Sequence, residues 1–428
     1  MKNNCCLLLI LTLCLALPSC SQAPTHSFSS QTASSSEAVQ PAPSAKVPSL
    51  KMLTSPDGLL FSSGAPAPDG FYDVFLNHDG SANIIYYDYA ARQTIYLSNQ
   101  VNSNHKDTSD TSYLEFAMGG VFPLNDGEYL YILKAPNSPL LRTGQEGGKG
   151  YLLRMDPNGQ NRAAISLPAA LKPALTSPMV GAAGNFIFLA HSTNKDNTSQ
   201  YKLLSTNFEK GALDELYSFE PDVPVFLLGS AGTQLLLCTA LPDSPPSALL
   251  LFDPAEGAIK PLPFDLNQKQ FFMAGGKLLF LNFGSVALYE YDPLAATTRQ
   301  VTASVVPDPL LFDELQLGQH VVDGFFFVQA YNLQKNRYER FAVDLETGEL
   351  RAQKLTDGDS PVQIISDAGE YYMVSLKDLE VTYDDFTPDG IPIKNVMLCP
   401  HYALIRKEDY WSGIPHYTEF ENQVFHAG

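Results

Sequence analysis

Acidic side chains occur at two spacings that could support chemistry. Asp357 and Asp359 lie two residues apart, and Asp384, Asp385 and Asp389 form a second acidic segment. Carboxylates at such spacings can supply oxygen ligands to calcium, but neither segment has the full ligand pattern of a calcium loop. Turn formation is the favoured explanation, because Asp side chains cap the backbone N–H groups of turns.

Histidines are scattered along the chain, at positions His78, His105, His191, His320, His401 and His416. A folded ring could still gather some of them as general bases, but surface or hydrogen-bonded roles are favoured. Trp411, the only tryptophan, could stack on a sugar ring, although packing between strands is favoured. The chain has no G-x-S-x-G, H-E-x-x-H or phosphate-loop pattern. We predict no catalytic residue, metal ligand or cofactor. Ligand-binding residues stay unassigned, and a protein that is not an enzyme is favoured.

The first twenty residues have the pattern of a secretory leader. Lys2 precedes an apolar run from Cys6 to Leu17, and the segment "LPSC" ends at Cys20. The run is too short to be a transmembrane span. This segment resembles the lipobox of bacterial lipoproteins, which implies cleavage after residue 19 and attachment of diacylglycerol to Cys20. An ordinary secretory leader that is cut nearby is the alternative.

Composition divides the rest of the chain. Residues 20–50 are rich in Ser, Ala and Pro, so we expect the lipidated cysteine to be followed by a disordered linker. Residues 51–428 are expected to form one domain. A formal net charge of −19 excludes a phosphate-binding surface, which needs clustered Lys and Arg. The chain is therefore expected to bind no nucleic acid. From the leader and the lipidated Cys20, we expect it to lie on the outer face of the cell membrane.

Cysteine positions argue against a disulfide framework. Of six cysteines, only Cys238 and Cys399 lie outside the leader and its cleavage point. Two cysteines so far apart in the sequence are more simply explained as buried free thiols than as a bridge.

A repeat organises residues 51–428. Seven times a glycine opens a strongly apolar or aromatic segment, at intervals of 44 to 57 residues: Gly70, Gly127, Gly184, Gly232, Gly276, Gly324 and Gly369. Each is followed by a second apolar segment that ends in a polar turn around Asp88, Asp156, Asn207, Asp253, Asp292, Asp344 or Asp409. Asp or Asn starts such turns, and Gly accepts the positive φ near their end. Each unit therefore contains a hairpin.

Four short strands in each unit of this length predict an all-β protein, a β-propeller. Seven blades of four antiparallel strands are favoured, and six or eight are possible. A pair of β-sandwiches or a β-helix is the competing fold. We expect Asp57–Gly64 to close the ring against the last blade.

Two segments carry a family resemblance, namely "YLSNQVNSNHKDTSDTSYLEF" and "YALIRKEDYWSGIPHYTEF". They resemble uncharacterised β-propeller lipoproteins of Gram-positive gut anaerobes. That family typically has a cluster spaced Cys-x4-Cys-x-His-x4-Cys after its first hairpin. Ser98, Ser103 and Asp110 occupy the cysteine positions here, and only His105 is kept, so a metal or disulfide at these positions is not expected.

Two classes of function remain. The favoured one is a lipid-anchored binding or interaction module for a glycan, a peptide or an envelope protein, and we expect it to be monomeric. The alternative is an extracytoplasmic lyase or hydrolase with its site at the propeller funnel. Specificity is expected in the longer segments between strands, which are Val101–Ser112, Ala135–Gly150, His191–Ser199 and Tyr383–Lys394.

Overall fold

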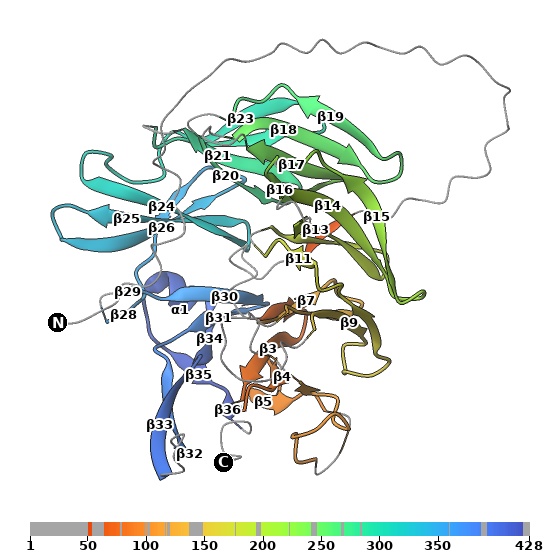
Figure 1. The fold of residues 1–428 in the computed structure, drawn as a ribbon. Coiled ribbons are helices and arrows are strands. Elements are labelled where there is room, and N and C mark those ends of the chain that lie inside the picture. The colour runs from red at the N-terminus through yellow and green to blue at the C-terminus, as the bar shows by residue number, and fades with distance from the viewer. Residues whose placement is uncertain are drawn as a thin grey trace, which may run out of the picture.

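Seven four-stranded antiparallel sheets form a ring in the computed structural model (Figure 1). The structure describes residues 50–53, 64–77, 79–98, 100, 103–115, 117, 120–136, 149–175, 177–193, 198–221, 223–240, 246–266, 269–282, 285–358, 360–386 and 392–422. The prediction of a seven-bladed β-propeller is confirmed.

Each blade uses four strands that follow one another in the chain. The last blade also has an insertion between its second and third strands. The blades are: β2 (Ala65–Ala67), β3 (Gly70–Leu76), β4 (Ala82–Asp88), β5 (Gln93–Tyr96); β7 (Val121–Asn125), β8 (Leu130–Lys134), β9 (Tyr151–Met155), β10 (Ala163–Ser166); β12 (Met179–Ala182), β13 (Asn185–Thr193), β14 (Ser199–Asn207), β15 (Ala212–Ser218); β16 (Val225–Ala231), β17 (Gln234–Ala240), β18 (Pro246–Asp253), β19 (Ala258–Leu262); β20 (Lys269–Ala274), β21 (Lys277–Asn282), β22 (Leu288–Asp292), β23 (Thr297–Thr302); β24 (Phe312–Val322), β25 (Phe325–Asn332), β26 (Arg337–Asp344), β27 (Leu350–Ala352); and β30 (Gln363–Ala368), β31 (Tyr371–Ser375), β34 (Tyr402–Arg406), β35 (Tyr417–Glu419).

Eight further strands lie outside the four-strand pattern of the blades. They are β1 (Lys51–Leu53) on β12, β6 (Tyr113–Leu114) on β4, β11 (Leu171–Pro173) on β13, the paired β28 (Thr356–Asp357) and β29 (Ser360–Pro361), the paired β32 (Leu379–Phe386) and β33 (Pro392–Cys399), and β36 (Glu421–Asn422) on β5. In the described part of the chain there is one α-helix, α1 (Lys407–Ser412). None of the described helices is long and apolar enough to cross a membrane.

Tight turns account for the glycine and Asp repeats. Six of the seven repeat glycines have a positive φ between the first and second strands of their blades. At the end of the third strand, side chains such as Asp344 accept backbone hydrogen bonds from the turn, here from Glu346 and Thr347 at 2.9 Å each. The sequence therefore repeats because the same two turns recur.

The last blade departs from this pattern. A turn was predicted around Asp409, but that residue lies in helix α1, which ends at Gly413 with a φ of 77°. Tyr410 is fully buried, and Trp411 stacks on Phe327 of the neighbouring blade at 6.1 Å. The aromatic pair gives α1 an apolar side to bury, which a two-residue turn could not provide.

Successive blades pack through apolar side chains of their facing sheets, and first strands contact one another between the first and second blades and from the third blade to the seventh. Phe71 and Tyr87 of the first blade meet Tyr402 of the last, and Phe420 packs on Tyr87 at 5.2 Å. Strand β36 then pairs in parallel with β5. The described closure therefore uses the C-terminal segment, whereas most of Asp57–Gly64, expected to close the ring, lies outside the described residues.

Two faces of the ring differ in their connections. Because all first strands run in the same direction, the connections after the first and third strands of the blades share one face, which we call the turn face; they are short turns except after the third strand of the last blade, where α1 stands. Connections from second to third strands and from blade to blade open on the opposite face, which we call the loop face. This division decides which side of the molecule carries the long segments.

Candidate functional site

A polar cluster lies at the outer edge of the first blade. Strands β5 and β6 both pair with β4, so the chain between them leaves the outermost strand position and returns to it. This excursion contains Ser98, Ser103, His105 and Asp110, the four positions of the family resemblance. The structure brings these four side chains together, although the segment Val101–Ser112 is only partly described.

Asp110 is the centre of the cluster. Its side chain is buried and accepts hydrogen bonds from Ser112 N and Oγ at 2.7 Å each, from Ser98 Oγ at 2.8 Å and from His105 Nδ1 at 2.8 Å. Burial alone would raise the pKa of this carboxyl, but the bonds from Ser103, Ser112 and Ser98 outweigh it and hold the pKa well below the usual range. Asp110 is therefore ionised wherever the protein is folded near neutral pH.

Asn83 of β4 joins the cluster to the sheet. Its Nδ2 donates to His105 O and Ser112 Oγ at 3.0 Å each, and its Oδ1 accepts from Asn77 Nδ2 at 2.8 Å. The ring of Tyr96 stacks on His105 with 4.0 Å between centroids. These contacts explain how a buried polar group is tolerated in the sheet.

A carboxylate that orients an imidazole is the arrangement of a general base. Here, however, the hydroxyls of Ser98 and Ser112 donate to the same carboxylate, so they serve to order the excursion. Among the described residues, no group of three or more His, Cys, Asp and Glu side chains could hold a metal ion. The cluster is thus best explained as a structural network with one half-buried imidazole.

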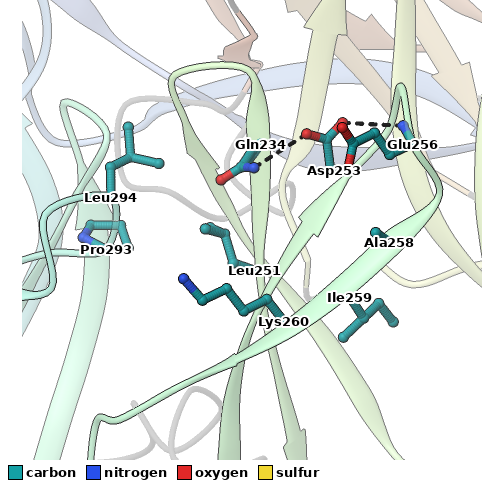
Figure 2. Close-up of a pocket in the computed structure, with 9 residues that line it drawn as sticks. All are labelled: Gln234, Leu251, Asp253, Glu256, Ala258, Ile259, Lys260, Pro293 and Leu294. Carbon is teal, nitrogen blue, oxygen red and sulfur yellow. Dashed lines mark hydrogen bonds between the residues drawn. The ribbon is translucent and has the colours of Figure 1, made fainter. Parts of the chain in front are cut away.

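A shallow groove of about 250 Å³ lies between the fourth and fifth blades on the turn face (Figure 2). Asp253 lines it and accepts from Gln234 Nε2 at 3.2 Å and from the backbone of Ala255 and Glu256. The hydrogen bond from Gln234 is the main cause that lowers the pKa of Asp253. Turn formation therefore uses the Asp253 carboxylate, and Gln234 is bonded to it.

Strand β1 occupies the inner edge of the third blade. Leu53 is buried, and Met52 packs against the first strand of the fourth blade. A Cβ on Gly229, whose φ is 151°, would lie 2.6 Å from Met52 Sδ, so only glycine makes room for this contact. Part of the central channel is thus filled by the protein's own N-terminal strand.

The direction of β1 follows from its partners. Leu50 N donates to Gly232 O and Lys51 Nζ donates to Asp126 O, and both acceptors lie in tight turns of the turn face. Leu53 pairs with Met179, where β12 starts at the loop face. The chain therefore enters the ring from the turn face and passes toward the loop face.

Three of the four long segments predicted to carry specificity open on the loop face. Ala135–Gly150 and His191–Ser199 join second to third strands, and Tyr383–Lys394 is the tip of the β32–β33 hairpin in the last blade. Only the ends of these segments are described. The fourth, Val101–Ser112, belongs to the outer edge of the first blade instead.

The remaining chemistry-bearing residues are spread over the ring. His191 is in β13, His320 in β24, and His401 and His416 flank the last blade, 3.7 Å from Glu419 and 3.4 Å from Asp409 respectively; His78 lies outside the described residues. Asp357 lies in β28 and Asp384 and Asp385 in β32, whereas Asp359 and Asp389 are not among the residues described.

Cys238 and Cys399 are buried free thiols, as predicted. Trp411 packs between the sixth and seventh blades. Sequence analysis missed Lys407, whose ammonium bridges Asp323 and Asp367 at 3.0 Å each across those blades. No local pattern marks such a residue, because its partners come from distant repeats.

Comparison with known proteins returns likenesses of fold. No known family model matches the chain, and no curated protein matches it. Among solved structures, it is similar to an oligogalacturonate lyase from Vibrio parahaemolyticus, with 10% identity over 86% of this chain and 100% of that one and a TM-score of 0.44. It is similar to the β-propeller domain of the Trilobed protease from Pyrococcus furiosus, with 10% identity over 87% of this chain and 99% of that one and a TM-score of 0.43. It is also similar to an acylaminoacyl peptidase from Pyrococcus horikoshii, with 8% identity over 80% of this chain and a TM-score of 0.46, and it spans half of that chain. At such identities and TM-scores these likenesses carry no conclusion about activity.

Proposed function

We propose that the protein is a lipid-anchored, extracytoplasmic binding module whose loop face receives a glycan, a peptide or an envelope protein. One observation carries this proposal. The long segments between second and third strands open on the loop face, while the chain that precedes Leu50 joins β1 at the turn face.

In this proposal, anchoring and recognition use opposite faces. Acyl groups on Cys20, followed by the linker of residues 21–50, would hold the turn face toward the bilayer at a mean distance of about 30 Å. The loop face is then the one farther from the attachment point. A ring with one elaborated face suits recognition, because loops from several blades can contact one partner.

The lyase or hydrolase alternative gains less support. It needs catalytic side chains from several blades to converge at the mouth of the channel. β1 fills the inner edge of the third blade instead, with Met52 and Leu53 as its apolar contacts. The polar cluster around Asp110 lies at the outer edge of the ring, and its side chains hydrogen-bond to one another.

Anchoring is tested with Cys20→Ser. We expect the unchanged protein to sediment with membranes of the producing cell and the variant to be released in soluble form. The matched control is Cys14→Ser, which leaves the predicted attachment point intact. Equal membrane association of the chain and the Cys20→Ser variant would contradict lipid attachment.

Binding is tested with glycan arrays and with crosslinking on intact cells, followed by incubation of the purified chain with polysaccharides and peptides. A partner that is retained unchanged supports the proposal. Turnover of a polysaccharide or peptide, with no retained partner, would establish the enzyme alternative in its place.

A further inference from the structure

The face that the sixth blade turns toward the seventh changes in character along its length. Near the turn face, Phe325 and Phe327 pack with Trp411 in the core between the two blades. Farther along β25 the same side carries Gln329 and Tyr331, because side chains alternate along a strand. Strands β25 and β26 have eight residues each, whereas β31 and β34 of the seventh blade have five. Figure 1 shows the ends of β25 and β26 projecting from the ring at the left. The polar part of this face therefore lies toward the loop face.

Three polar side chains form a row across this part of the blade. Arg340 of β26 lies opposite Gln329 in the strand register, and Gln353 follows on the other side, where its N donates to Arg340 O at 2.9 Å. Tyr331 and Tyr338 form the next pair toward the loop face, with 5.2 Å between their ring centroids. All five side chains are half-buried. Two amides, a guanidinium group and two aromatic rings are thus presented together.

The guanidinium group of Arg340 has no acidic partner in the described part of the chain. It lies 4.9 Å over the ring of Phe327, and no hydrogen bond or ion pair joins it to a described residue. Its nitrogens are not among the buried polar atoms that lack a partner, so they contact solvent. Burial nevertheless lowers its pKa, since protein surrounds the group in part. Glu314, at the same end of the blade, accepts from Tyr338 Oη at 2.6 Å instead. A guanidinium group that the protein leaves unneutralised can pair with a carboxylate from outside.

The two amides indicate what surrounds that carboxylate. Gln353 Nε2 donates to Leu355 O at 3.1 Å and to Val362 O at 2.6 Å, which fixes this side chain, while its Oε1 is buried without a partner. Gln329 has no hydrogen bond from its side chain to a described residue. An amide both donates and accepts, as sugar hydroxyl groups do. Strand β25 is paired along both edges, so a ligand meets side chains here and not an open backbone edge. This favours a sugar over an extended peptide.

We propose that the row of Gln329, Arg340 and Gln353, with Tyr331 and Tyr338, binds an oligosaccharide that carries carboxylates, as uronic acids do. Arg340 receives a sugar carboxylate, Gln329 bonds to hydroxyl groups, and the tyrosines contact the C–H face of a neighbouring sugar. The net charge of −19 opposes acidic ligands over most of the surface, so an unneutralised guanidinium group marks where one can bind. This inference rests on the proposed binding function and names the ligand class for one part of the loop face.

The test measures binding of the purified full-length chain by isothermal titration calorimetry. The probes are short oligomers of mannuronic, glucuronic and galacturonic acid, each with the oligomer of the corresponding neutral sugar. We expect an acidic oligomer to bind about tenfold more tightly than its neutral counterpart, because only the acidic one forms charge-assisted bonds with Arg340. Arg340→Gln should abolish this preference and leave the binding of the neutral oligomer unchanged.

Arg351→Gln is the matched control. Its guanidinium group lies over Phe325 on the same face, also at 4.9 Å, but it is nearer the turn face and is already bonded to Glu349 at 3.3 Å. This variant should bind as the unchanged chain does. Tyr338→Ala should weaken acidic and neutral oligomers alike, since an aromatic contact does not depend on the carboxylate.

A structural role of Arg340 is separated from binding by thermal unfolding of each variant without ligand. Arg340→Lys keeps the charge but not the planar fork, so it should keep part of the preference for the acidic oligomer. The inference is overturned if no acidic oligomer binds, if Arg351→Gln loses as much binding as Arg340→Gln, or if Arg340→Gln weakens acidic and neutral oligomers by the same factor. A partner that the Arg340→Gln chain retains on arrays or cells as firmly as the unchanged chain would uphold the binding function while excluding this row as its site.

Discussion

At the scale of single residues, Asp110 shows what spacing in a sequence can and cannot predict. The family resemblance placed Ser98, Ser103, His105 and Asp110 in one group, and they do meet in space. Asn83, which joins the group to β4, could not be identified from the sequence. It lies in an apolar strand, and no local pattern indicates that its side chain bonds to His105, more than twenty residues away.

Replacing Asp110 by Asn tests the network. The amide cannot accept charge-assisted bonds from every donor, and we expect a loss of about 2 kcal/mol in the free energy of unfolding at neutral pH. Because folding lowers the pKa of Asp110, its contribution is complete above the pKa of the unfolded chain, about 4, and falls as the pH drops below that value.

The difference between the unchanged chain and Asp110→Asn should therefore shrink below about pH 4, as measured by urea unfolding at a series of pH values. Asp107→Asn is the control, since Asp107 is exposed in the same excursion and its amide can still accept from Ser109. A pH-independent difference for Asp110→Asn would show that the carboxylate is not the source of the effect.

The two thiols give a second residue-scale prediction. Burial raises the pKa of Cys238 to about 12 and also raises that of Cys399, so neither is a thiolate in the folded protein. Mass spectrometry should find both unmodified after iodoacetamide treatment of the native chain and both alkylated after unfolding. Alkylation of Cys399 alone in native conditions would mean that the base of the hairpin opens.

At the scale of elements, the second and third strands of the blades could be predicted because they carry their own signals. A glycine opens the strongly apolar or aromatic second strand, and a polar turn around Asp or Asn follows the apolar third strand. Helix α1 and strand β1 have no such signal. Lys51–Leu53 is too short to show a period, and its conformation is imposed by pairing with β12, which only the folded ring can supply.

Leu53→Ala tests whether β1 is an integral part of the ring. The side chain is 1% exposed and belongs to the core between the second and third blades, so we expect a loss of about 3 kcal/mol in the free energy of unfolding. The measurement is chemical denaturation. Lys51→Ala, at the exposed start of the same strand, should change stability by less than about 0.5 kcal/mol. Equal small effects would mean that β1 is dispensable.

At the scale of the whole molecule, closure depends on residues that come last in the chain. Phe420 packs on Tyr87 and β36 pairs with β5, so the C-terminal segment adds its own contacts to those that Tyr402 of the seventh blade makes with the first blade. The number of blades could be predicted from the seven repeats. The manner of closure could not, because Glu421–Asn422 has no repeat of its own.

Phe420→Ala is expected to cost about 3 kcal/mol and to lower the midpoint of thermal unfolding. Ile414→Ala, in the same final segment but 40% exposed, should have a much smaller effect. Because closure couples all blades, we expect the loss to appear in one cooperative transition followed by circular dichroism. A separate early transition, with the main one unchanged, would instead indicate local fraying of β36.

The path of β1 through the ring also has a mechanical consequence. A force on the chain before Leu50 pulls along the axis of β1, toward the turn face from which it entered. The hydrogen bonds between Lys51–Leu53 and β12 run across that axis, so they are loaded together in shear and not broken one after another as in unzipping. Met52 and Leu53 would also have to be drawn past the inner strands. The protein thus resists being pulled from its N-terminal end most strongly along the direction in which a tether would act.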